Sequence, residues 1–144
     1  MKAVFDTSIL VAAMVEAHPK HDLALPWLEK AKSGHVGYLV SAHSLAELFS
    51  VLSTLPTSPR PTPAMARRLI RENVEGHAHV ITLTRRDYSA VLQSMENLGL
   101  SGGVVYDALI ARAAQKARAD RLLTLNPADF ARVWPEGAGV IDSP

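Results

Sequence analysis

The chain has 144 residues, the size of one ordinary domain, and 48% of them are apolar, which is enough to build a core. It contains no cysteine, which excludes disulfides, thiolate chemistry and thiolate metal sites. The formal net charge is only +1, so the chain does not bind nucleic acid through a strongly basic overall field. A nucleic-acid substrate would have to bind at a local patch.

No apolar run approaches the ~20 residues that a membrane-spanning helix needs. Near the N-terminus, Asp6 interrupts what would have to be the apolar core of a signal peptide. We therefore expect a cytoplasmic protein with no membrane association.

The first part of the chain is typical of a strand followed by two helices. The strand is Lys2–Phe5, and the first helix runs from Thr7 to about Ala17. The second helix is Asp22–Lys32, with Gly34 as its C-terminal cap.

The middle part contains a strand, two helices and a proline-rich connection. Gly37–Val40 is predicted as the strand and Ser41–Leu55 as a helix. Residues 56–63 contain four prolines and cannot form a helix or a central strand. They could divide two domains, but each half would then have too few elements to close a core, so a stiff connector is favoured. The helix Pro63–Val74 follows, with Thr62 as its N-cap.

The last part adds three strands and three helical segments. The strands are His79–Leu83, Arg121–Leu125 and, more weakly, Gly139–Ile141. The helices are Thr84–Leu98, Val104–Ala119 and a short turn from Asp129 to Val133. Thr84-x-x-Asp87 resembles a capping box at the first of them.

Strands that alternate with helices predict a single α/β domain over residues 1–144 with a mainly parallel central sheet. Ligands of such sheets gather outside the carboxyl ends of the strands, and Asp6 lies at such an end. Taken alone, Asp6 is explained better as a helix N-cap, since Asp is a preferred cap residue.

Asp107 points more clearly to function. At about 100° per residue it shares a helix face with Ile110, Ala111 and Ala114, so it begins the core-facing stripe. A carboxylate that faces the protein needs a partner, because burying it unpaired is costly. The alternative, a first-turn acid favoured by the helix dipole, does not require an inward direction.

Glu47 is ambiguous. Ser44-x-x-Glu47 matches a capping box, which would make Glu47 structural. Ser41 is an equally good N-cap, and it would place Glu47 inside the helix. Asp6, Glu47 and Asp107 together, without cysteine or histidine ligands, would suit Mg²⁺ or Mn²⁺, whose natural chemistry is hydrolysis or transfer at a phosphate.

Four segments in this order resemble the PIN-domain family, and within it the VapC-type toxins of prokaryotic toxin–antitoxin pairs. The segments are Val4–Ser8, Ser41 with Glu47-Leu48, Gly102–Ala111 and Leu122–Phe130. The resemblance spans nearly the whole chain, and its most specific parts are the blocks around Asp107 and Asn126.

The resemblance implies a three-layer α/β/α domain and a metal-dependent endoribonuclease. Asp6, Glu47 and Asp107 correspond to the family's catalytic, metal-binding acids. The supporting hydroxyls would be Thr7, Ser8 and Thr124. Many members carry a fourth acid where this chain has Asn126, so either Asn126 or Asp129 is expected as the further ligand, and the number of metals is left open.

The family also suggests a homodimer that is inhibited by a cognate antitoxin. The proline-rich connector lies where such toxins carry a helical arm that receives partners. Arg67, Arg68 and Arg71 follow it, and either line an RNA path or form a solvated helix face, which is the slightly favoured interpretation.

The leading hypothesis is therefore a Mg²⁺- or Mn²⁺-dependent ribonuclease toxin that hydrolyses RNA phosphodiester bonds. A PIN-like module that binds RNA or protein without cleaving is the first alternative, because Asn126 replaces an acid. A different phosphohydrolase is the second, but the Asp-x-Asp motif of aspartyl-phosphate enzymes is missing, since Ser8 follows Asp6 at that spacing.

Overall fold

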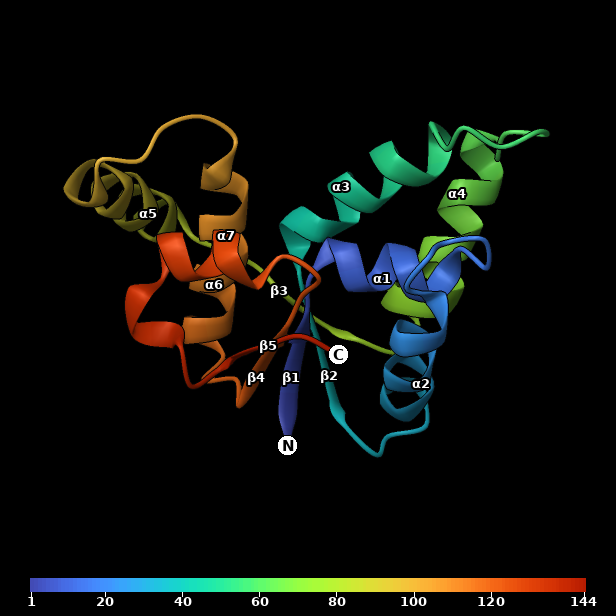
Figure 1. The fold of residues 1–144 in the computed structure, drawn as a ribbon, viewed down its shortest axis with the longest axis horizontal. Coiled ribbons are helices and arrows are strands. Elements are labelled where there is room, and N and C mark those ends of the chain that lie inside the picture. The colour runs from blue at the N-terminus through green and yellow to red at the C-terminus, as the bar shows by residue number, and fades with distance from the viewer.

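A computed structural model describes residues 1–144 and contains one five-stranded sheet in the order β3-β2-β1-β4-β5 (Figure 1). All four strand pairs are parallel. The strands are β1 Lys2–Phe5, β2 Gly37–Ser41, β3 His79–Ile81, β4 Arg121–Leu123 and β5 Ile141–Asp142. The carboxyl ends of the strands therefore all meet at one edge of the sheet.

Helices cover both faces of the sheet, which confirms the predicted three-layer α/β/α architecture (Figure 1). On one face lie α1 Thr7–Met14, α2 His21–Lys32, α3 Ala42–Ser53, α4 Pro63–Ile70 and the π-helical turn η1 Arg71–Glu75. On the other face lie α5 Arg85–Leu98, α6 Val104–Lys116, α7 Pro127–Val133 and the 3₁₀ turn η2 Pro135–Gly137.

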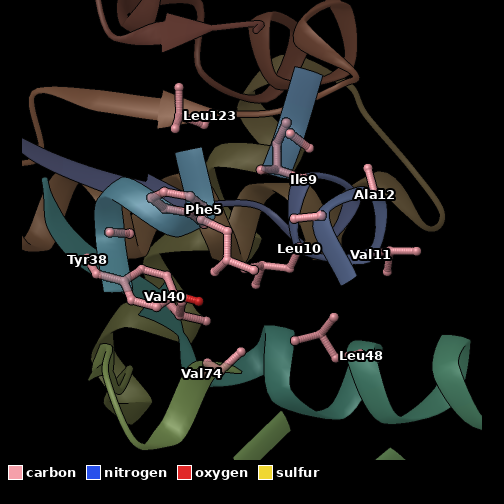
Figure 2. Packing of buried hydrophobic residues seen from close by; sticks show 14 of the residues in the cluster. Phe5, Ile9, Leu10, Val11, Ala12, Tyr38, Val40, Leu48, Val74 and Leu123 are labelled. Carbon is pink, nitrogen blue, oxygen red and sulfur yellow. The ribbon is translucent and has the colours of Figure 1, made fainter. Parts of the chain in front are cut away.

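Alternation along the strands supplies side chains to both cores. In β1, Ala3 and Phe5 pack toward the α1 side while Val4 packs toward the α6 side. Phe5 meets Tyr38 edge to face, with ring centroids 4.9 Å apart (Figure 2). The buried α3 residue Leu48 joins this first core, and it fixes the helix that carries Glu47 beside the end of β1.

Several predicted bounds were too long, and each shorter element has a local reason. α1 ends at Met14 because Val15 adopts an extended backbone. β3 ends at Ile81, the residue that pairs with the last residue of β2. β4 ends at Leu123, after which the Thr124 side chain turns to Asp6. The last strand is also shifted, since it covers Ile141–Asp142 rather than residues 139–141.

The predicted helix 63–74 is divided into two parts. Thr62 caps it as expected, since its side chain accepts a hydrogen bond from the N–H of Met65. The α-helix gives way to a π-helical turn at Arg71. The hydroxyl of Tyr38 donates to the carbonyl of Asn73 in this turn, so one carbonyl is bound from outside the helix.

The remaining helix predictions differ by a few residues. α3 covers Ala42–Ser53 with Ser41 in the N-cap position, and α7 begins two residues early, at Pro127. The capping box of Thr84 and Asp87 at α5 is confirmed. The proline-rich residues 56–62 form no helix or strand, as predicted. None of the helices is both long and apolar enough to span a membrane.

Candidate active site

The carboxyl-end edge of the sheet brings the three predicted acids to one cavity of about 290 Å³. Asp6 follows β1, Glu47 lies on α3 after β2, and Asp107 lies in the first turn of α6. Neither Lys nor Arg lines this cavity. The lining residues are Asp6, Thr7, Ser8, Val11, His18, Glu47, Val51, Asp107 and Asn126.

Asp6 is the most deeply buried of the three, with 4% of its surface exposed. It occupies the N-cap position of α1, but its side chain makes no capping hydrogen bond, so the prediction of a capping role for this side chain was wrong. Instead, its Oδ2 accepts hydrogen bonds from the hydroxyls of Ser8, at 2.7 Å, and Thr124, at 2.9 Å. Burial raises the pKa of Asp6, and these hydroxyls only partly offset the increase.

The two hydroxyls that hold Asp6 are themselves fixed by the segment after β4. Ser8 Oγ accepts a hydrogen bond from the N–H of Leu125, at 3.0 Å. Thr124 Oγ1 accepts one from the N–H of Asn126, at 2.9 Å. The ends of β1 and β4 are thus joined through side chains, and the orientation of the Asp6 carboxylate follows from this network.

Glu47 projects from the middle of α3 and takes no part in a capping box, which decides the ambiguity of the sequence pattern. Its Oε1 accepts a hydrogen bond from Thr7 Oγ1, at 3.1 Å. The same oxygen lies 3.2 Å from Nε2 of His43, one helical turn earlier. Burial raises the pKa of Glu47, His43 and Thr7 lower it, and the negative charge of Asp6 raises it again.

Asp107 is half-buried at the rim of the core, and the next residues of its stripe, Ile110 and Ala111, are buried, as the helical wheel predicted. Burial raises the pKa of Asp107 to about 7, with further increases from the charges of Asp6, Asp129 and Glu47. The three carboxyls therefore repel one another across the cavity.

These acids do not form a complete metal cluster by themselves, because no three His, Asp or Glu side chains are close enough together to hold an ion. Their chemistry nevertheless fits a hard cation. All three have raised pKa values, and a cation in the cavity would stabilise their charged forms. Mg²⁺ commonly keeps several waters and takes only one or two carboxylates, so it does not require a closed protein cage.

The two alternatives for the further ligand lie in different places. Asn126 lines the same cavity as the three acids, at the N-terminal end of α7. Asp129 lines a neighbouring cavity with Asp107 and Arg132, and its side chain is half exposed. Asn126 therefore lies at the cavity of all three acids, whereas Asp129 is near Asp107 alone and raises its pKa through its charge.

The sequence interpretation missed two histidines and a tyrosine at this edge. His18 lines the acid cavity, and His43 contacts Glu47. His43 also stacks on Tyr106, the residue before Asp107. The spacing of four residues between His43 and Glu47, which places them on one helix face, was the available signal.

Two of the three arginines that follow the proline-rich connector have local partners. Arg67 pairs with Glu75 and Arg68 with Glu72. None of these residues lines the acid cavity. These contacts agree with the favoured interpretation of a solvated helix face.

Comparison with known families identifies the class of protein. The family model of the PIN domain matches residues 3–134. The chain therefore belongs to the PIN-domain family.

Within this family the chain is similar to two curated proteins of Mycobacterium tuberculosis. It is 34% identical to Ribonuclease VapC27 over 115 residues, which are 80% of this chain and 78% of that protein. It is 29% identical to Ribonuclease VapC40 over 119 residues, which are 83% and 82% of the two chains.

A solved structure shares the fold. The structure described as VapBC2 from Rickettsia felis bound to a DNA fragment from their promoter aligns with a TM-score of 0.68 and 21% identity. The alignment covers 100% of this chain and 99% of the other.

Proposed function

We propose that this protein is a metal-dependent endoribonuclease of the VapC type that hydrolyses RNA phosphodiester bonds. The observation that carries the proposal is the acid cavity, which is lined by three carboxyls with raised pKa values and by no Lys or Arg. Both similar proteins from Mycobacterium tuberculosis are named ribonucleases.

Asp6, Glu47 and Asp107 would hold Mg²⁺ or Mn²⁺, and the side-chain carbonyl of Asn126 would add a neutral oxygen. When bound, such a cation supplies Lewis-acid chemistry, acidifying water and neutralising charge on phosphoryl oxygens. Asn126 adds no negative charge, so we propose a single tightly held cation rather than two.

The hydroxyls have a positioning role in this proposal. Ser8 and Thr124 bind Oδ2 of Asp6 and so fix the direction of the carboxylate. Thr7 does the same for Glu47. Such supporting hydrogen bonds orient metal ligands and tune their basicity.

We also propose that the protein pairs with an antitoxin. Solved structures with the same fold are described as VapBC2 from Rickettsia felis and VapBC-1 from nontypeable Haemophilus influenzae. The expected homodimer stays a prediction, and size-exclusion chromatography with light scattering tests it.

The proposal is tested by incubating the purified protein with total RNA in Mg²⁺ or Mn²⁺, with EDTA as the metal-free control. Matched variants are Asp6→Asn and Asp107→Asn, which keep side-chain size and remove the charge. We expect cleavage that requires the metal and is lost in both variants.

The other hypotheses give different results in the same experiment. RNA binding without any cleavage would support a non-cleaving PIN module. Release of phosphate from small esters while RNA stays intact would support a different phosphohydrolase. Wild-type cleavage rates in both variants would contradict the role of the acid cavity.

A further inference from the structure

Beside the acid cavity, two aromatic rings form a stacked pair. The rings of His43 and Tyr106 are nearly parallel, at 6°, and their centroids lie 5.1 Å apart. Tyr106 is nevertheless 50% exposed. Its ring is therefore fixed by a neighbour while much of its surface remains available for a contact.

The position of this pair connects it to the three acids. Tyr106 directly precedes Asp107 on α6, and His43 lies one turn before Glu47 on α3. The two rings line a cavity of about 310 Å³ with Ala46, Glu47 and Ser50. Because Glu47 lines both cavities, the aromatic cavity adjoins the acid cavity.

We propose that Tyr106, backed by His43, is a stacking platform for one unpaired base of the RNA substrate. This rests on the proposed function, because the base would belong to a nucleotide whose phosphate lies at the acid cavity. Aromatic side chains bind unstacked bases in single-stranded RNA, whereas a base inside a duplex presents no free face. The platform would therefore favour cleavage where the RNA is unpaired.

His43 has a positioning role in this arrangement. Its ring covers one side of Tyr106, and its Nε2 lies 3.2 Å from the Glu47 carboxylate. The contact links the direction of the tyrosine ring to the helix that carries Glu47. A rigid ring loses little conformational freedom when a base stacks on it.

Tyr88 provides an internal control. It lies on α5 and is 46% exposed, close to the value for Tyr106. It lines neither the acid cavity nor the aromatic cavity. An exposed tyrosine by itself is ordinary on a protein surface, so the comparison isolates the effect of position.

The experiment measures binding of a fluorescently labelled, single-stranded RNA oligonucleotide of mixed sequence by anisotropy. It is done without added metal in the Asp6→Asn background, which we expect to prevent cleavage. Tyr106→Ala is compared with Tyr88→Ala, and Tyr106→Phe is included because it keeps the aromatic ring.

Tyr106→Ala should weaken binding about 5- to 100-fold, the range that corresponds to loss of one base–aromatic stack. Tyr106→Phe and Tyr88→Ala should bind within about twofold of the background protein, a difference too small to represent a lost stack. Replacing single nucleotides of the oligonucleotide with abasic residues should weaken binding at one position, and Tyr106→Ala should remove that sensitivity.

Equal binding by Tyr106→Ala and Tyr88→Ala would overturn the inference, as would a loss with Tyr106→Ala that does not depend on any base. Failure of the proposed function is distinguishable. If the wild-type protein never cleaves RNA but binding depends on Tyr106, the nuclease proposal fails and the platform stands. If the wild-type protein cleaves RNA but Tyr106→Ala does not weaken RNA binding, only the inference of a stacking platform fails.

Discussion

Asp6 and Asp87 are buried to nearly the same extent, with 4% and 6% exposed, but their surroundings are opposite. Asp87 accepts hydrogen bonds from Nε of Arg112, at 3.0 Å, and Nζ of Lys116, at 2.8 Å. Asp6 receives side-chain hydrogen bonds from neutral hydroxyls, and acids are its charged neighbours.

The pKa values of the two acids shift accordingly. The Lys116 ammonium, with the N–H of Thr84 and the Arg112 guanidinium, holds the pKa of Asp87 well below its usual range. Burial raises the pKa of Asp6. The charge of Asp87 is balanced within the protein by Lys116 and Arg112. No Lys or Arg lines the acid cavity, and in our proposal a cation from solution balances its charge. The Asp87 carboxylate is structural, and our proposal assigns the Asp6 carboxylate to catalysis.

The largest expected effect separates these two acids by activity. Asp6→Asn and Asp107→Asn should each lower the RNA cleavage rate by more than about 100-fold, because losing only a supporting partner of a metal ligand already costs about 10- to 100-fold. Asp87→Asn, assayed at a temperature where it is folded, should cleave at the wild-type rate. Initial rates on one RNA oligonucleotide in Mg²⁺ measure this difference. A comparable loss of cleavage rate in Asp87→Asn would contradict the assignment of different roles to Asp6 and Asp87.

Asp87→Asn should instead lower the midpoint of thermal unfolding by several degrees, since Arg112 and Lys116 lose their carboxylate partner. The folded-state pKa of Asp87 lies below the ordinary value of 3.8. Its contribution to stability is therefore complete above that value and is lost as the pH falls through the folded-state pKa. Thermal unfolding from pH 6 down to about 2 checks this. The difference in unfolding midpoint between wild type and variant should narrow toward the acidic end, and a constant difference would contradict the sign.

A smaller effect is expected for the hydroxyl that orients Asp6. Thr124→Val keeps the shape of a fully buried side chain but removes the hydrogen bond that it donates to Asp6 and the one that it accepts from the N–H of Asn126. We expect a cleavage rate about 10-fold lower, in the range for a supporting partner of a metal ligand. Thr54→Val, at an exposed residue after α3, is the matched control and should retain the wild-type rate.

The smallest effect concerns stability without metal. The pKa of Asp107 is about 7 in the folded protein against an ordinary 3.8, so ionising it costs folding free energy as the pH rises between these values. In EDTA at pH 8, Asp107→Asn should therefore be more stable than wild type by about 1 kcal/mol, a value reduced for the partial exposure of this side chain. Urea unfolding measures the difference. A less stable variant would show that repulsion between Asp107 and the neighbouring acids does not destabilise the folded protein.

Much of the fold was predictable because the strands are short and apolar and alternate with helices, some of which have recognisable caps. Thr62, Thr84 and Gly34 marked helix ends through local chemistry, and the alternation of strands and helices implied the parallel sheet. The π-helical turn after α4 was not predictable, since it involves a contact between Tyr38 and Asn73, which lie 35 residues apart.

The acid cavity shows the same limit. The inward direction of Asp107 follows from helical periodicity, which is local. The hydroxyl of Thr124 reaches Asp6 across 118 positions in the sequence, and no periodicity predicts such a contact. The contact of His43 with Glu47 is local, one helical turn apart, but its stacking on Tyr106 arises only when α3 and α6 meet.

Calorimetric titration of Mg²⁺ into the metal-free protein tests the central claim most directly. We predict saturable binding to the wild type and to Asp87→Asn, and a loss of that binding in Asp6→Asn and Asp107→Asn. Wild-type Mg²⁺ affinity in Asp6→Asn and Asp107→Asn, or no Mg²⁺ binding by the wild type, would contradict the assignment of the acid cavity as a cation site.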